Sequence, residues 1–169
     1  NDDELSDWDP LVKMAIIHHQ FESIHPFYDG NGRTGRIINI LYLVKEGLLN
    51  LPILYLSRYI NINKAEYYRL LQKVRTDNSW EEWIIFILNG VEQTSLQAIK
   101  IIEGIKNLMQ SHKERIRTEL PKIYSQDLLN NLFYHPYTKI DFLIDETGVS
   151  RKTATKYLDE LARIGIVRK

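Results

Sequence analysis

The 169-residue sequence contains no cysteine, which excludes disulfide bonds and cysteine-based metal sites. It also has no apolar run of membrane-spanning length and no signal-like stretch, so we expect a cytoplasmic protein without membrane association. The net charge is zero, because 22 basic residues balance 22 acidic ones. Charge alone therefore does not argue for or against a nucleic-acid partner. The composition, with 44% hydrophobic residues, is that of an ordinary globular protein of one or two domains.

The most informative segment is His25–Arg36, which reads HPFYDGNGRTGR. His25 is the one group in it that readily acts as a general base near neutral pH. Asp29 is a hard oxygen ligand for Mg²⁺, which bridges phosphates and uses only one or two protein carboxylates. Arg33 and Arg36 are three positions apart and share a helix face, where two guanidinium groups can clamp adjacent phosphates. The segment therefore predicts chemistry on a phosphate-containing group.

Apolar helices are predicted on both sides of this segment. Asp9 followed by Pro10 is typical of an N-cap and a first helical position, and it opens a helix over Leu11–Ser23. The apolar run 37–48 predicts a second helix, which closes near Gly47. The segment is therefore a loop between two core helices, and its second half begins the later helix.

The start of that later helix is a suitable site for an anion. The N–H groups at a helix N-terminus have no intrahelical partner, and the helix dipole is positive there. Gly30 and Gly32 allow the backbone to curl so that several N–H groups point at one phosphate.

The same twelve residues resemble the signature of the Fic family, H-P-F-x-[DE]-G-N-G-R-x-x-R, and match it at every specified position. The resemblance extends over the flanking helices to about Ser95. Most Fic proteins transfer AMP from ATP to a Ser, Thr or Tyr hydroxyl of a target protein and release pyrophosphate. The resemblance therefore implies ATP as the donor, Mg²⁺ as the cofactor and a protein as the partner.

The family pattern also implies a role for each matching residue. His25 would deprotonate the acceptor hydroxyl, Asp29 would hold Mg²⁺ against the α- and β-phosphates, and Phe27 would pack into the core and fix the loop. The residues expected to bind the nucleotide phosphates are Gly30, Asn31, Gly32, Arg33, Gly35 and Arg36. Of these, positions 30–32 would form an anion hole, and the two arginines would grip the β- and γ-phosphates.

A zinc site is the alternative interpretation of the nearby histidines. His18, Glu22 and His25 recur at intervals of four and three residues, but this is not the His-Glu-x-x-His spacing of a zinc protease. The helix is also predicted to end before His25. We therefore expect His18 and His19 to be packed or hydrogen-bonded structural residues.

The middle of the chain is predicted to be mainly helical. Leu51–Ile60, with Pro52, is predicted as an extended or turn connection, and a capping box at Asn63 opens a helix to about Arg75. A second capping signal at Ser79 opens a run that stays compatible with a helix to about Glu119, with a kink or break at Asn89-Gly90. Beyond Gly90 the run is expected to be a spacer helix with one packed face or, alternatively, a contact in a homodimer.

Pro121 marks the expected domain boundary, and short helices are predicted at Asp127–Phe133 and from Thr138. The turn 146–150 places Ser150 as the N-cap of a helix over Arg151–Arg163, and Ile166-Val167 is predicted to begin a strand. This pattern resembles a helix-turn-helix of the winged-helix type. The candidates for contact with DNA are Arg151, Lys152, Thr155 and Lys156. From Pro121 on, eight basic residues face six acidic ones, so a protein-contact or dimerisation module is the alternative.

The sequence thus predicts an all-α protein with a Fic-type helical bundle (1–95), a connecting helix (96–120) and a winged-helix-like domain (121–169). Its predicted function is that of a protein adenylyltransferase. The alternatives are a nucleotide-sensing, DNA-binding regulator with a weakly active or inactive core, and an interaction scaffold. A kinase-like relative or another donor is a further alternative, although kinase-like members carry lysine at the position of Gly32.

Fic proteins normally have helices and a β-hairpin flap ahead of the motif. The 24 residues that precede His25 are too few for both, so we expect the chain to begin inside the fold. We also expect an incomplete wing at Lys169 and poor activity of this segment by itself.

Overall fold

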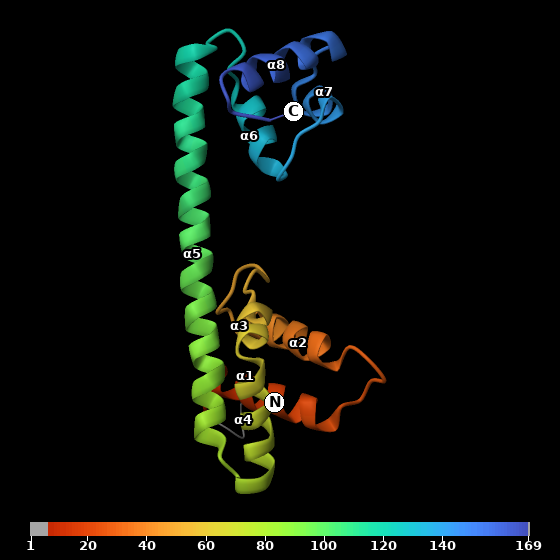
Figure 1. The fold of residues 1–169 in the computed structure, drawn as a ribbon, viewed down its shortest axis with the longest axis vertical. Coiled ribbons are helices and arrows are strands. Elements are labelled where there is room, and N and C mark those ends of the chain that lie inside the picture. The colour runs from red at the N-terminus through yellow and green to blue at the C-terminus, as the bar shows by residue number, and fades with distance from the viewer. Residues whose placement is uncertain (1–6, 169) are drawn as a thin grey trace. The chain divides into compact units, whose positions relative to one another are not determined.

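The computed structural model describes residues 7–168, and within them it contains helices and no strand, which confirms the all-α prediction. The helices are α1 (Pro10–Ile24), α2 (Asn31–Lys45), α3 (Leu56–Ile62), α4 (Lys64–Asp77), α5 (Trp80–Glu119), α6 (Gln126–Tyr134), α7 (Ile140–Thr147) and α8 (Arg151–Arg163) (Figure 1). The chain divides into two compact units, one up to Lys100 and the other from Ile101, and α5 contributes residues to both. Each unit has its own apolar core.

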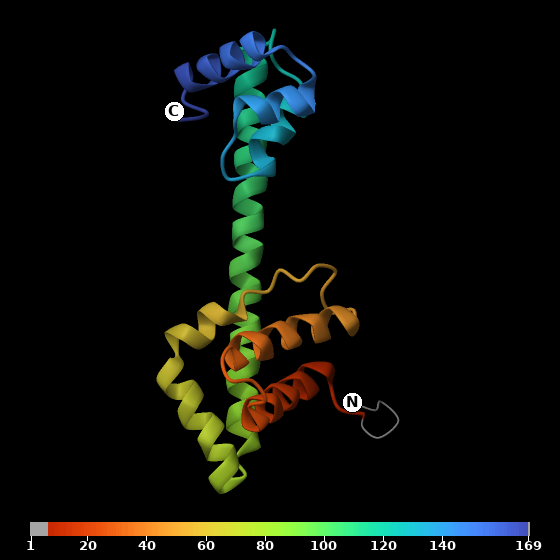
Figure 2. The same ribbon diagram turned by 90° about the vertical axis from the view of Figure 1, so that its right-hand side faces the viewer.

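The first unit is built on α1 and α2, which pack side by side (Figure 2). The Asp9 side chain accepts a hydrogen bond from the Leu11 amide at 2.8 Å, and Pro10 occupies the first helical position, so α1 begins as predicted. Beneath the two helices, Trp83 of α5 is completely buried and donates its indole N–H to the Ala15 carbonyl oxygen at 2.8 Å. This bond ties α5 to the middle of α1.

Of the kink or break predicted at Asn89-Gly90, the break is wrong, because α5 is continuous through these residues. Gly90 is buried, and a Cβ atom added to it would lie 2.6 Å from Tyr59 Cδ1 and 3.0 Å from Leu56 Cδ1. The missing side chain therefore lets α3 approach α5 closely. The prediction of an extended or turn connection at Leu51–Ile60 is only partly correct, because residues 56–60 belong to α3.

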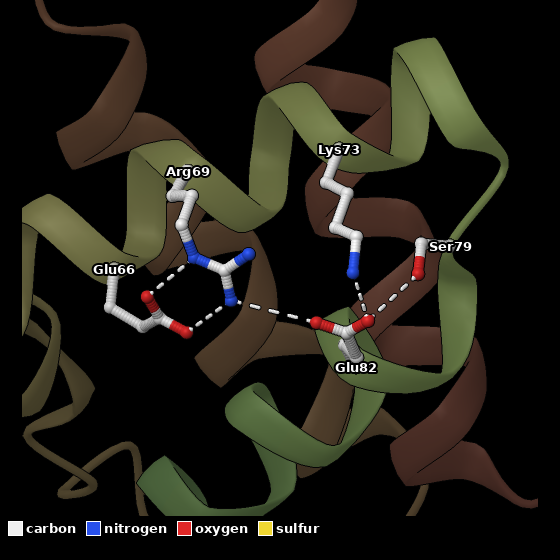
Figure 3. A network of polar contacts seen from close by, with 5 residues as sticks. All are labelled: Glu66, Arg69, Lys73, Ser79 and Glu82. Carbon is white, nitrogen blue, oxygen red and sulfur yellow. Dashed lines mark hydrogen bonds and ion pairs between the residues drawn. The ribbon is translucent and has the colours of Figure 1, made fainter.

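A network of polar contacts joins α4 to the start of α5 (Figure 3). Arg69 donates two hydrogen bonds to Glu66, at 2.8 and 2.7 Å, and one of its nitrogens lies 3.5 Å from a Glu82 oxygen. Glu82 also accepts hydrogen bonds from Lys73 and from the Ser79 hydroxyl. The bond from Lys73 is the main reason why the pKa of Glu82 is lowered. Glu66, Arg69 and Glu82 are exposed, so the network contributes little to stability.

The second unit packs α6, α7 and α8 with the end of α5 around a small core. Its fully or nearly fully buried members are Ile116, Leu128, Leu129, Leu143, Ala154 and Leu161. Gly148 ends α7 with a positive φ of 69°, and the Ser150 hydroxyl accepts a hydrogen bond from the Thr153 amide, so the predicted turn and the bounds of α8 are confirmed.

The strand predicted to begin at Ile166-Val167 is wrong, because these residues form a bend after α8. A strand needs a neighbour for its backbone hydrogen bonds, and within residues 7–168 no other strand supplies one. The same described part of the chain holds no helix with the length and apolar character that a membrane crossing requires.

His18 and His19 are structural residues, as predicted. The His18 ring is fully buried, its Nε2 is 3.0 Å from the Tyr67 hydroxyl oxygen, and it stacks on Trp83. His19 Nε2 donates to the Leu71 carbonyl oxygen at 3.2 Å. The pKa of His18 is lowered from 6.5 to about 4, mainly by burial and next by the positive charge of Arg36.

This buried ring should make stability depend on pH. Between pH 6.5 and 4 the unfolded chain binds a proton at His18 that the folded chain does not, so the free energy of unfolding falls as the pH drops. From these two pKa values, His18 should account for a loss of about 2 kcal/mol between pH 7 and pH 5. Urea unfolding of the wild type and of His18→Gln at both pH values measures the contribution. The variant should show the smaller difference, and the same difference in both proteins would contradict the assignment.

Candidate active site

A cavity of about 670 Å³ lies between the His25–Arg36 segment and the helices α3 and α4. On one side it is lined by His25, Asp29, Gly30, Asn31, Gly32, Arg33 and Arg36. On the other side α4 contributes Lys64, Tyr68, Gln72 and Arg75, among others. The structure therefore brings the predicted site residues of this segment together around one space, with the exception of Gly35.

Gly35 lies toward α1 rather than among the residues that line the cavity. A Cβ atom on it would be 2.8 Å from Glu22 Oε1, 3.1 Å from Phe21 Cδ1 and 3.2 Å from His18 Cε1. A larger residue would not fit unless these side chains of α1 moved. Gly35 thus permits the close approach of α1 and α2, the two helices that the motif loop connects.

The loop between α1 and α2 is closed by the side chain of Asn31. Its Oδ1 accepts a hydrogen bond from the Phe27 amide at 2.9 Å, and its Nδ2 donates to the Phe27 carbonyl oxygen at 2.6 Å. The Asn31 residue is only 3% exposed, so water competes little for these bonds. The expectation that Phe27 packs into the core and fixes the loop is wrong, because Phe27 is 51% exposed and the Asn31 amide holds the loop instead.

The first turn of α2 presents free backbone donors to the cavity. Gly30 is the N-cap with a φ of 84°, and no side chain within the described residues caps the helix. The first helical hydrogen bond runs from the Thr34 amide to the Gly30 carbonyl oxygen at 2.9 Å. The amides of residues 31–33 come before it, so they have no partner within the helix. Free donors at the positive end of a helix dipole form a site for an anion.

His25 stands at the other end of the loop. It ends α1 in a left-handed conformation with a φ of 50°, and its amide donates to the Phe21 carbonyl oxygen at 3.0 Å. Its side chain is exposed and lines the cavity. The imidazole is therefore accessible to a substrate beside the first turn of α2.

The charged side chains around the cavity are mostly cationic. Arg33, Arg36, Lys64 and Arg75 face only two carboxylates, Asp29 and Glu22. Asp29 is exposed and accepts a hydrogen bond from Arg33 at 3.1 Å. Glu22 is buried, and burial raises its pKa, while Arg36 and His25 lower it. The balance of charge favours a polyanion such as a nucleotide.

Asp29 is the residue that fits a divalent cation. Within residues 7–168 no group of three or more His, Cys, Asp or Glu residues converges as a metal cluster. A single exposed carboxylate at the edge of an anion site suits Mg²⁺, which keeps several waters and is held mainly by substrate phosphates. Of the residues of the zinc alternative, His18 has its Nε2 within hydrogen-bond distance of the Tyr67 hydroxyl.

Residues of α3 and α4 at the cavity were not identified from the sequence. Lys64, Tyr68, Gln72 and Arg75 recur at intervals close to the helical period and so share one face of α4. This polar face was visible in the sequence, but nothing in the sequence indicated that it faces the motif. Ser57 of α3 was also missed, although its hydroxyl oxygen accepts a hydrogen bond from Arg36 Nε at 2.8 Å.

The candidate DNA contacts lie on the first turns of α8 in the second unit. Arg151 pairs with Asp141 of α7 at 2.9 Å, and the Thr155 hydroxyl donates to the Arg151 carbonyl oxygen, while Lys152 and Lys156 are exposed. The neighbouring α7 also carries the exposed acidic residues Asp145 and Glu146. Contact with DNA stays a prediction.

Two family models match the chain. Residues 1–43, which contain the whole motif, match the Fic/DOC family. Residues 108–169 match the family described as the C-terminal domain of the SoFic-like protein adenylyltransferase. Together the two matches include the predicted active site and most of the second unit.

Curated relatives carry the same designation. A probable protein adenylyltransferase of Aquifex aeolicus is 49% identical over 59 residues, which are 34% of this chain and 18% of that protein. The protein adenylyltransferase fic-1 of Caenorhabditis briggsae is 36% identical over 73 residues, 42% of this chain and 13% of the relative. The protein adenylyltransferase Fic of Drosophila erecta is 29% identical over 94 residues, 56% of this chain and 18% of the relative. The chain thus matches less than a fifth of the length of each of these relatives.

Replacing Asn31 should open the loop. Asn31→Ala removes both hydrogen bonds to Phe27, and a buried bond of this kind contributes about 1 kcal/mol. Hydrogen exchange of the Phe27 amide should therefore become about tenfold faster or more, while exchange in the middle of α1 changes little. Asn61→Ala, at an exposed asparagine that also lines the cavity, is the matched control. Unchanged exchange at Phe27 would show that another contact holds the loop.

Proposed function

We propose that this chain is a member of the Fic family and that it acts as a protein adenylyltransferase, which transfers AMP from ATP to a hydroxyl group of a target protein. The observation that carries the proposal is that one cavity contains an accessible imidazole, the free N-terminus of α2 and two arginines. The family model that matches the second unit and the relatives are all named for protein adenylyltransferases, which supports the same activity.

In this proposal the polyphosphate of ATP binds at the first turn of α2. The free amides of residues 31–33 donate to phosphate oxygens, and Arg33 and Arg36 compensate the remaining negative charge. Asp29 would hold Mg²⁺, which when bound neutralises charge on the phosphates. The opposite wall offers the exposed aromatic ring of Tyr68 and the side chain of Leu71 as surfaces for the nucleobase.

His25 acts on the acceptor. Its imidazole takes the proton of the target's Ser, Thr or Tyr hydroxyl, and the oxygen forms a bond to the α-phosphorus of ATP. The bond between the α-phosphorus and the bridging oxygen to the β-phosphorus breaks, and pyrophosphate leaves with the electron pair. The protein contributes mainly position and charge in such a step, which suits a site formed by backbone donors and arginines.

The test uses self-modification, because it requires no knowledge of the target. The whole chain is incubated with Mg²⁺ and ATP labelled at the α-phosphorus, and incorporation is followed together with intact mass. His25→Ala should lower incorporation by about 10²–10⁴-fold but leave ATP binding largely unchanged, because His25 acts in chemistry. His135→Ala, at an exposed histidine of the second unit, is the control and should label like the wild type. Absence of label on the wild type, or equal label on His25→Ala, would contradict the proposal.

A further inference from the structure

We infer that Ser57 is a positioning residue for Arg36, so that α3 and its contact with α5 form part of the phosphate site. This inference rests on the proposed function, since it assigns Arg36 to the phosphates beyond the α-phosphate. The residues that carry it are Ser57 and Arg36, the buried Glu22 beside them, and Gly90 of α5.

The hydrogen bond to Ser57 fixes one edge of the Arg36 guanidinium group. Nε donates to the Ser57 oxygen at 2.8 Å, in a partly buried position. A guanidinium group has five N–H bonds in a rigid plane, so an anchored Nε leaves the Nη1 and Nη2 edge free for an anion. Nη1 lies 3.1 Å from the position that a Cβ atom on Gly32 would occupy, which places this free edge beside the first turn of α2.

Arg33 lacks such an anchor. Its side chain is 73% exposed, and the partner that it contacts, Asp29, is 92% exposed. A surface pair of this kind orders a side chain weakly. Of the two motif arginines, Arg36 is therefore the one whose orientation the fold determines before a ligand binds, which reduces the entropy lost on binding.

Glu22 makes the anchor necessary. Its carboxylate is buried beneath the first turn of α2, and Oε1 has no hydrogen-bond partner within the described residues. This oxygen lies 3.8 Å from the position of a Cβ atom on Gly32, the same position that is 3.1 Å from Arg36 Nη1. Without the bond to Ser57, Arg36 would turn toward this unpaired carboxylate, because an ion pair would relieve its burial. The Ser57 hydroxyl keeps the guanidinium group available for phosphate.

The position of Ser57 depends in turn on the packing of α3 against α5. Leu56, next to Ser57, is 1% exposed, and the ring of Tyr59 lies 5.1 Å from that of Phe86. The side chains of Leu56 and Tyr59 occupy the space where a side chain at position 90 would lie. The glycine in α5 thus lets α3 come close enough to bring Ser57 to Arg36.

The experiment compares ATP and AMP binding to the whole chain in the presence of Mg²⁺ by calorimetry. Ser57→Ala should weaken ATP binding by about tenfold, which corresponds to the loss of one hydrogen bond and of the ordered guanidinium group. AMP lacks the outer phosphates, so its affinity should change less than about twofold. Ser57→Thr retains the hydroxyl and should restore ATP binding, and Glu22→Gln combined with Ser57→Ala should recover part of it. Ser79→Ala, which removes a hydroxyl from the polar network in Figure 3, is the matched control and should have no effect.

The outcomes separate this inference from the proposed function. Failure of the wild type to bind ATP would overturn the proposed function and the inference with it. Normal ATP binding by Ser57→Ala, with a wild type that binds ATP, would overturn the inference alone. An equal loss of ATP and AMP affinity, or no recovery in Ser57→Thr, would show that Ser57 only stabilises the fold and would also overturn it.

Discussion

The two hydrogen bonds between the Asn31 side chain and the backbone of Phe27 are the interaction on which the site depends. They fold the connection between α1 and α2 into one compact loop, with His25 at its start and Gly30 at its end. Both ends of the loop consequently line the same cavity, and a base is placed beside a helix N-terminus whose donors are free. A more open loop would leave both groups in the molecule but separate the base from the anion site.

The remaining structure supports this loop through close contacts that small residues allow. Gly35 brings α2 against α1, and Gly90 brings α3 against α5. The buried indole of Trp83 then ties α5 to α1. Interiors packed this closely have few alternative arrangements, so the exposed His25 at the end of α1 is carried on a rigid frame. Exposed reactive groups on a rigid frame would suit the proposed transfer to a protein acceptor.

The sequence predicted the parts of the fold that depend on local signals. Asp9 and Ser150 cap α1 and α8 at the expected residues, and the motif lies at the junction of two core helices. It did not predict features that depend on tertiary contacts. Gly90 was interpreted as a kink or break because a glycine inside a helix has that local tendency, whereas in the structure it lets α3 lie close to a continuous α5. Phe27 was expected in the core from the resemblance to the family pattern, and Ile166-Val167 was expected to form a strand, which requires a partner.

The candidate site shows the same division. The contiguous motif identified most of one wall of the cavity but not Glu22 or Tyr28, and the opposite wall comes from α3 and α4, more than twenty positions later. The most direct test of the central claim is a titration of the isotope-labelled chain with ATP and Mg²⁺, followed by the backbone amide resonances. The account predicts that the largest saturable shifts occur at the amides of Asn31, Gly32 and Arg33. Binding that leaves these three amides unchanged, with its shifts elsewhere in the chain, would contradict it.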